Sequence, residues 1–125
     1  MFGFFGGAKF ERLSEDVVRP WGSFHALAKE EGKWFVKLLK IRKGERISLQ
    51  KHKKREEMWF IISGKVKVQK GTDVFNLGRG ESVFIEKEEL HRLKGLTDAE
   101  FIEVSLGDFD EDDEVRLEDD YGRVG

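Results

Sequence analysis

The sequence predicts a single all-β domain, either a sandwich or a barrel of antiparallel strands. From Trp34 onward, short apolar runs recur between turn signals roughly 8–12 residues apart, a spacing typical of such folds. No long stretch repeats its apolar residues at helical spacing. The 125 residues are 38% hydrophobic and 12% aromatic, so the chain is apolar enough to build one core and too apolar to be disordered.

Eight segments have the length and composition of strands. Segment 58–63, MWFIIS, is almost entirely apolar, which predicts a central strand covered on both faces. Segment 65–70, KVKVQK, alternates between polar and apolar residues, which predicts a half-exposed, peripheral strand. The turns between strands contain glycines that can adopt positive φ. In chain order, the predicted strands are 34–41, 47–52, 58–63, 65–70, 73–77, 82–86, 91–95 and 101–106.

The two ends of the chain differ from this central pattern. Residues 1–16 begin with MFGFFGGAKF and are expected to form an arm that packs on its own domain or on a second subunit. This segment lacks the features of a secretory signal and is too short to span a bilayer. The domain itself is expected to cover residues 17–123, with Pro20 holding the chain extended before the first strand. The acidic tail contains apolar anchors in its second half, which is therefore expected to dock.

Charge and cysteine content exclude several classes of function. Lys+Arg 23 against Asp+Glu 25 gives a net charge of −2, which argues against nucleic-acid binding. The absence of cysteine excludes disulfides, thiolate nucleophiles and cysteine-based zinc sites. Any metal must therefore be held by histidine, carboxylate or amide oxygen. We expect a cytoplasmic protein with no nucleic-acid or membrane partner.

The stretch SLQKHKKREEMWF contains a group of candidate metal ligands. Strand alternation puts Gln50 and His52 on one side of the predicted strand. Glu57 is expected to face them across a hairpin, above the apolar side chain of Trp59. His91 follows the loop EKEEL and is the candidate for a fourth ligand. Either histidine alone would more often be a solvated or hydrogen-bonded residue than a ligand.

Two spaced motifs in the chain resemble those of the cupin family. The first cupin motif is G, five residues, H, x, H, three or four residues, E, six residues, G. The second motif begins with G and contains a histidine. Glutamine replaces the first histidine here, and the matching positions are Gly44, Gln50, His52, Glu57 and Gly64 in the first motif and Gly80 and His91 in the second.

Four further features resemble the cupin domain of type II mannose-6-phosphate isomerases. They are RPWG at 19–22, SLQxH at 48–52, the R-x-E-x-W pattern at 55–59 and VRLEDDYGR at 115–123. The resemblance covers about residues 17–123 and implies a double-stranded β-helix, also called a jelly-roll barrel. In that family the domain usually follows a mannose-1-phosphate guanylyltransferase domain, for which this chain has no nucleotide-binding loop, so we predict no guanylyltransferase activity.

The resemblance implies a metal-dependent isomerase that interconverts mannose 6-phosphate and fructose 6-phosphate, or a related pair of sugar phosphates. Its metal ligands would be Gln50, His52, Glu57 and His91. Zn²⁺ is the preferred ion, although Mn²⁺, Fe²⁺, Co²⁺ and Ni²⁺ also suit these ligands.

Three further residues are candidates for the chemistry. Arg55 lies beside Glu57 in the R-x-E-x-W pattern, where its guanidinium could bind a phosphate or an enediolate oxygen. Glu103 and Lys54 are candidates for the general base. Because homologous domains of this size often pair their sheets, a homodimer is also expected.

Two other functions fit the same residues. A non-catalytic cupin could keep the metal and bind a sugar or sugar phosphate. It is favoured by the missing transferase part and by Lys53, Lys54 and Met58, which stand where the family typically has histidine. A metal oxygenase is compatible with the ligand set but gains no support from RPWG or the tail.

Overall fold

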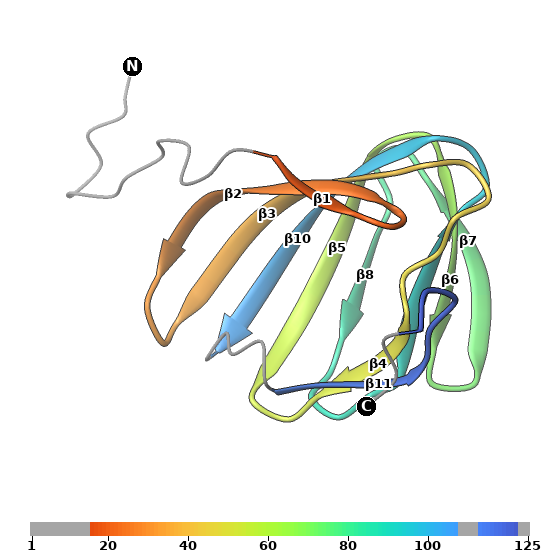
Figure 1. The fold of residues 1–125 in the computed structure, drawn as a ribbon. Coiled ribbons are helices and arrows are strands. Elements are labelled where there is room, and N and C mark those ends of the chain that lie inside the picture. Colours follow the sequence, from red (N-terminus) through yellow and green to blue (C-terminus); the bar gives the residue numbers. More distant parts are fainter. Residues whose placement is uncertain (1–15, 108–112, 123–125) are drawn as a thin grey trace, which may run out of the picture.

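Two antiparallel sheets face each other in the computed structural model, which describes residues 16–107 and 113–122 (Figure 1). One sheet has six strands in the order β1-β2-β3-β10-β5-β8, and the other has five in the order β11-β4-β9-β6-β7. The strands are β1 (Val17–Arg19), β2 (Gly22–Glu30), β3 (Trp34–Ile41), β4 (Leu49–His52), β5 (Arg55–Ser63), β6 (Lys65–Lys70), β7 (Asp73–Gly78), β8 (Ser82–Ile85), β9 (His91–Gly95), β10 (Ala99–Gly107) and β11 (Glu114–Glu118).

The prediction of an all-β fold built from antiparallel strands is confirmed. β3, β6 and β9 have the predicted bounds, and the other five predicted strands differ only at their ends. The sequence prediction missed three strands, namely β1, β2 and β11. Segment 22–30, GSFHALAKE, contains Ala, Leu, Lys and Glu, which favour helices. Its pairing with β3 along nearly its whole length overrides that preference.

The core lies between the two sheets and is formed by the inward side chains of alternating residues. Trp59, Ile61 and Phe101 from the six-stranded sheet are 0% exposed, as are Val66 and Leu93 from the five-stranded sheet. Burying each such side chain contributes about 1.5–3 kcal/mol. The rings of Trp59 and Phe101 meet edge to face, with 6.0 Å between their centroids.

Two expectations about exposure need correction. β6 alternates as predicted, but it lies between β9 and β7 and is not a peripheral strand. β5 lies between β10 and the edge strand β8, and only one of its faces is covered by the residues that the structure describes. Phe60 and Ile62 on its outer face are 39% and 36% exposed. The apolar sequence MWFIIS predicted that both faces of the strand would be buried. Residues 16–107 and 113–122 bury only the inner face.

The connection from β4 to β5 is not the predicted hairpin. β4 belongs to the five-stranded sheet and β5 to the six-stranded sheet, so the turn between them carries the chain from one sheet to the other. Glu57 therefore faces His52 across the interior of the sandwich. The turn at 53–54 is fixed by Asp113, whose carboxylate accepts hydrogen bonds from the backbone N–H groups of Lys53 and Lys54.

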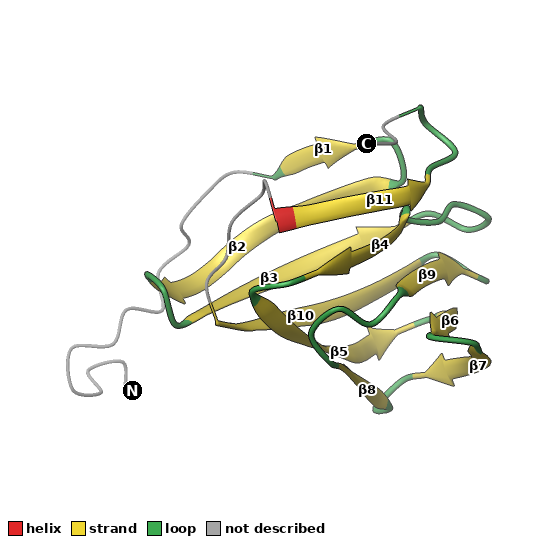
Figure 2. Cartoon of the chain, turned by 90° about the horizontal axis from the view of Figure 1, so that it is seen from below, coloured by secondary structure: helices red, strands yellow, loops and turns green. Residues whose placement is uncertain are grey.

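The tail docks, as its apolar anchors predicted. β11 pairs antiparallel with β4, and Figure 2 shows the two strands side by side. Arg46 forms two hydrogen bonds with Asp120, and the Tyr121 hydroxyl donates one to Glu45. The predicted arm, apart from Asp16, lies outside the described residues. Within the described part of the chain, no helix is long and apolar enough to cross a membrane.

Candidate metal centre

Three side chains from three strands meet between the sheets. His52 ends β4 and His91 begins β9 in the five-stranded sheet, while Glu57 lies on β5 opposite them. One ligand atom from each of the three residues lies within 4.8 Å of the others. His52, Glu57 and His91 are 2%, 2% and 1% exposed. The structure thus brings together three of the four predicted ligands in a buried group that could hold a metal ion.

Hydrogen bonding determines which nitrogen of His91 faces this group. His91 Nδ1 lies 2.8 Å from the backbone oxygen of Glu89, which can only accept, so we assign the proton to Nδ1. In the neutral ring the lone pair is then on Nε2, which lies 3.1 Å from Glu57 Oε1. Two facing lone pairs repel each other unless a cation lies between them, and this cation can be a proton or a metal ion. The donor set therefore fits a metal.

The second histidine approaches the same carboxylate oxygen. His52 Nε2 lies 3.5 Å from Glu57 Oε1, and the two imidazole rings are 5.0 Å apart. Among the described residues, His52 Nδ1 is buried without a hydrogen-bond partner, and the only close polar neighbour of buried His91 Nε2 is Glu57 Oε1, without the geometry of a good hydrogen bond. Buried polar atoms normally have one, and a bound ion is one explanation when they do not.

Glu57 and His91 titrate in opposite directions from their usual ranges. Burial alone would raise the pKa of Glu57, but hydrogen bonds and positive charge from His52 and His91 hold its pKa well below the ordinary carboxyl value. Burial alone would lower the pKa of His91, but the hydrogen bond and charge of Glu57 raise it. Negative charge on Glu57 is thus stabilised by a neighbouring cation, a role that a metal ion can also fill.

Gln50 occupies the position next to these three residues. It is 8% exposed, lies on the same side of β4 as His52 and pairs with His91 across the sheet. Its amide nitrogen donates to the backbone oxygen and to the hydroxyl of Ser48, at 3.3 and 3.1 Å. These bonds fix the amide orientation and leave Oε1 as the atom with which Gln50 could bind a metal.

Arg55 is buried beside the candidate ligands. Its Nε donates to Glu57 Oε2 at 3.1 Å, and its Nη2 lies 3.2 Å from His52 Nε2. A guanidinium holds such partners in a fixed geometry because its donors form a rigid planar fork. Ser105 also approaches Glu57 Oε2, at 3.4 Å. Arg55 therefore orients Glu57, whereas its contact with His52 uses the Nε2 lone pair, which a metal bound at that atom would have to take over.

A row of buried polar side chains crosses β3, β10 and β5 beside the candidate ligands. Glu103 pairs in register with Lys37 on one side and with Trp59 on the other. Trp59 Nε1 donates to Glu103 Oε1 at 3.0 Å, while Lys37 Nζ lies 3.8 Å from Glu103 Oε2. The ring of Trp59 is 5.6 Å from that of His91, which links the row to the ligand group.

The charges in this row are almost completely buried. Lys37 and Glu103 are each 8% exposed, and Lys37 Nζ lies over the rings of Phe24 and Phe35, at 4.5 and 5.3 Å. Burial and the negative charge of Glu57 raise the pKa of Glu103, although Lys37 and Arg55 oppose this shift. A buried carboxyl with a raised pKa beside a candidate metal group is a common feature of catalytic sites.

The sequence prediction found Glu103 but missed Lys37. In WFVKLLKI both alternating sets of residues contain apolar side chains and one lysine, so alternation could not show that Lys37 points inward and Lys40 outward. The other base candidate, Lys54, lies exposed in the turn between β4 and β5. The structure brings together Gln50, His52, Arg55, Glu57, His91 and Glu103, but not Lys54.

Comparisons with known proteins agree with this geometry. The family described as Mannose-6-phosphate isomerase C-terminal matches residues 7–119. The chain is 40% identical over 112 residues to the xanthan biosynthesis protein XanB of Xanthomonas campestris pv. campestris, covering 86% of this chain and 24% of XanB. It is 36% identical over 121 residues to the mannose-1-phosphate guanylyltransferase of Escherichia coli K12, covering 94% of this chain and 25% of that protein.

The cupin domain of Schizosaccharomyces pombe Cnp3 has a similar fold, with a TM-score of 0.69 at 15% identity over 77% of this chain and 70% of that one. The chain spans about a quarter of the length of the two curated relatives. Its match to the family nonetheless includes every described strand and all four predicted ligands. This chain is a cupin domain that belongs to the mannose-6-phosphate isomerase C-terminal family.

Proposed function

We propose that this domain is a metal-dependent isomerase that interconverts mannose 6-phosphate and fructose 6-phosphate, or a closely related pair of sugar phosphates. The observation that carries the proposal is the position of Glu103 inside the same barrel as His52, Glu57 and His91. Glu103 pairs with Trp59, whose ring contacts that of His91. An aldose–ketose isomerisation needs a group that polarises two oxygens and a base that moves a proton between adjacent carbons. The family match supports this choice of reaction.

His52, Glu57 and His91 would hold the metal, with Gln50 Oε1 as the fourth ligand. Two imidazoles, one carboxylate and one amide suit Zn²⁺ best and also accept Mn²⁺, Fe²⁺, Co²⁺ or Ni²⁺. The bound cation would polarise the carbonyl and hydroxyl oxygens of the sugar and so acidify the intervening C–H bond.

Glu103 is the general base in this proposal. Its carboxylate takes the proton from C2 of the aldose and returns it to C1, while the hydroxyl proton of O2 passes to O1; together the two transfers yield the ketose with no net loss of protons. Trp59 holds the carboxyl group in place through Nε1. Lys37 keeps a positive charge next to it, which favours the ionised form that the base needs. Arg55 orients Glu57 and, with Nη2 released from His52 Nε2 when the metal is bound, binds an anionic oxygen of the substrate.

A coupled assay with mannose 6-phosphate tests the proposal. The purified protein is stripped of metal with a chelator and then reloaded separately with Zn²⁺, Mn²⁺ and Co²⁺. Turnover restored by at least one ion is the expected result. Stoichiometric metal binding without turnover of mannose 6-phosphate or of related aldose phosphates would overturn the isomerase assignment.

That negative result would support the alternative, a metal-containing module that binds a sugar phosphate without converting it. The alternative is favoured by the relatives' length, since the matching segment is only about a quarter of proteins named for another activity or pathway. Calorimetric binding of mannose 6-phosphate to metal-loaded protein, with no product formed, would distinguish it.

A further inference from the structure

The outer face of the five-stranded sheet carries a row of cations on three neighbouring segments. Lys67 on β6 lies directly opposite Lys94 on β9, and Lys94 in turn forms a β-bridge with Arg46, which precedes β4. Val66 and Leu93, the neighbours of these lysines along their strands, are 0% exposed in the core, so the lysines point outward. Three positively charged residues therefore stand side by side on this face.

Such a row is unfavourable unless an anion covers it. Like charges directly opposite each other on paired strands destabilise a sheet, because their Cβ atoms are only about 4.5–5.5 Å apart. Among the described residues, neither Lys67 nor Lys94 forms an ion pair. The chain as a whole has a net charge of −2, so the concentration of cations is local. It indicates a negatively charged ligand at this place.

The row borders a hollow in the surface. The hollow has a volume of about 240 Å³, which is below the range of about 300–1,000 Å³ for the pockets of drug-sized ligands. It therefore suits a small ligand. The residues that line it are four cations, one amide and one valine, namely Arg46, Lys67, Arg92, Lys94, Gln69 and Val74.

Contacts with the C-terminal segment hold the two arginines of the hollow in place. Arg92 Nε donates to the backbone oxygen of Ile47 at 3.0 Å, and its Nη1 and Nη2 donate to Glu118, each at 3.2 Å. Arg46 donates to Asp120 from Nε and Nη2, at 2.6 and 2.7 Å. Cations that are already fixed lose little conformational freedom when a ligand binds, which favours binding.

The lysines give the hollow a surplus of positive charge. Arg46 is balanced by Asp120 and Arg92 by Glu118, which leaves two of the four cations without a carboxylate. The pKa of Asp120 is lowered, first by its hydrogen bond with Arg46 and then by the positive charges of Arg46, Arg92 and Lys94. A ligand with about two negative charges would neutralise the surplus. A phosphate monoester carries about −1.5 to −2 at pH 7.

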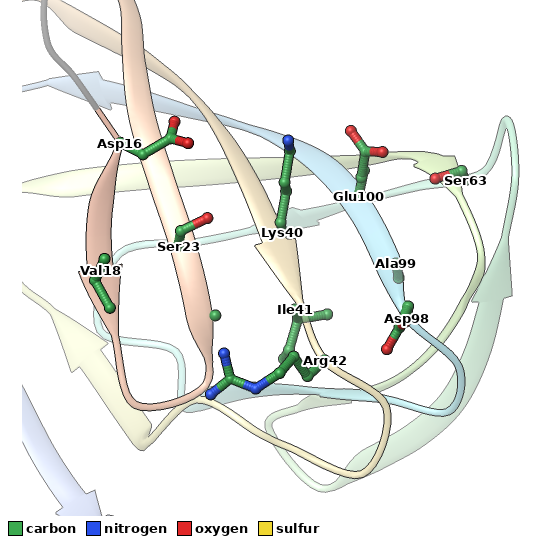
Figure 3. A pocket seen from close by; sticks show the side chains of 11 residues that line it. Asp16, Val18, Ser23, Lys40, Ile41, Arg42, Ser63, Asp98, Ala99 and Glu100 are labelled. Carbon is green, nitrogen blue, oxygen red and sulfur yellow. The ribbon is translucent and has the colours of Figure 1, made fainter.

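The larger hollow on the other sheet lacks this surplus. It has a volume of about 530 Å³ and is lined by two cations, Lys40 and Arg42, and by three carboxylates, Asp16, Asp98 and Glu100. Figure 3 shows the side chains of Lys40 and Glu100 standing next to each other. An anion would gain little where both signs of charge are already mixed. The basic character is thus specific to the hollow on β6 and β9.

We propose that the hollow lined by Arg46, Lys67, Arg92 and Lys94 binds the phosphate group of a small phosphate ester. Ammonium and guanidinium groups both form charge-assisted hydrogen bonds with phosphate oxygens. Val74, which is 55% exposed, lines the same hollow and offers apolar surface to the organic part of the ester. The sequence pattern that encodes the site is the alternation of lysine with buried apolar residues in β6 and β9.

The proposed site is separate from the metal centre. Along β9, His91 and Leu93 point into the core, whereas Arg92 and Lys94 line the hollow on the other side of the sheet. The two sites share no side chain. The inference therefore goes beyond the proposed isomerase, and either can fail while the other stands.

A titration followed by two-dimensional amide NMR tests the proposal, because it shows where a ligand binds. The full chain, free of unbound metal ions, is titrated at constant ionic strength with inorganic phosphate, with glycerol 1-phosphate and with sodium chloride. Saturable shifts of the amide signals of residues 67–69 and 92–94 are expected with both phosphates. A Kd of about 1 mM is expected for inorganic phosphate, since exposed charge pairs are individually weak. The ester should bind more tightly because of Val74.

Substitutions of the exposed lysines test the assignment. Lys67→Ala and Lys94→Ala should each weaken phosphate binding about fivefold, and both together at least about twentyfold. The matched control is Lys65→Ala, which removes an exposed lysine from the same face of β6 but outside the hollow. It should leave the Kd unchanged.

Four outcomes would overturn the proposal. The first is the absence of saturable shifts at residues 92–94, including the case in which phosphate shifts only signals near Arg55. The second is an equal effect of chloride, which would reduce the row to general screening. The third is an equal loss of binding in Lys65→Ala. The fourth is tighter binding of a single-stranded oligonucleotide, increasing with its length, which would assign the face to nucleic acid.

Discussion

In β5 charged side chains point into the protein and apolar side chains point to solvent, the reverse of the usual arrangement in a strand. The inner face buries the charges of Arg55 and Glu57, whereas the outer face exposes Phe60 and Ile62. Burying charge and exposing apolar surface are both unfavourable in isolation. On the inner face the two charges pair with each other, and a bound cation would further offset the negative charge of Glu57. On the outer face a second apolar surface would cover the exposed side chains.

Removing a ligand from the inner face should have the largest effect. His91→Ala leaves Glu57 buried with one fewer imidazole, so we expect metal affinity to fall at least about 100-fold and isomerase turnover to be lost. Competition with a calibrated chelator measures the affinity. The control is His25→Ala, since His25 lies on β2 and bonds to Asp16 away from the ligand group. Equal metal affinity in both variants would remove His91 from the site.

Replacing the proposed base should affect rate but not metal. Glu103→Gln keeps the shape of the side chain and its bond with Trp59, but it cannot take up a proton. We expect kcat to fall about 100- to 10,000-fold with metal content unchanged. Glu100→Gln, on the outer side of the same strand, is the matched control and should retain full activity. A Glu103→Gln enzyme with normal kcat would exclude Glu103 as the base.

Lys37→Met should have a smaller effect with a characteristic pH dependence. Lys37 lowers the pKa of Glu103, so removing its charge raises that pKa and moves the acidic limb of the pH–rate profile to higher pH. At a pH below the new limb, a shift of one unit lowers kcat about tenfold. Lys40→Met on the outer side of β3 should leave the profile in place. A uniform fall in rate with an unmoved limb would point to a packing role for Lys37.

Metal affinity itself should depend on pH in a defined direction. Because Glu57 raises the pKa of His91, the ring holds its proton at higher pH than a free imidazole does. A metal must displace that proton, so affinity is highest above the raised pKa and falls by about tenfold for each pH unit below it. Isothermal titration with Zn²⁺ between pH 8 and pH 5.5 measures the slope. Constant affinity over this range would contradict the role of His91 as a ligand whose proton the metal displaces.

Sequence patterns predicted the parts of the fold that depend on local alternation. The strands from 34 to 106 and the inward direction of Gln50, His52 and Glu57 follow from side chains that alternate between faces. The turns that require glycine were also predicted from the sequence. At Gly64, where φ is 82°, a Cβ atom would lie 2.3 Å from the backbone oxygen of Asp98, so only glycine fits.

The features that the sequence did not reveal depend on contacts between distant segments. β2 has a helix-like composition and becomes a strand only because β3 pairs with it. Assigning β4 and β5 to different sheets requires the sheet order, which no local pattern contains. Lys37 and Lys40 look alike in the sequence, and only the pairing with Glu103 separates a buried cation from an exposed one.

The pairing of β4 with β11 also sets an order of events during synthesis. β4 has one register pair with β9, whereas β11 pairs along its length, and Asp113 binds the turn at 53–54 from 60 positions later in the chain. A nascent chain that has already made β5 to β10 still presents the edge of β4 unpaired, a surface open to proteases and to pairing with other chains. The strand carrying Gln50 and His52 gains its second neighbouring strand only when residues 114–118 are present. Residues 113–118 would therefore be needed to hold His52 where it could bind a metal.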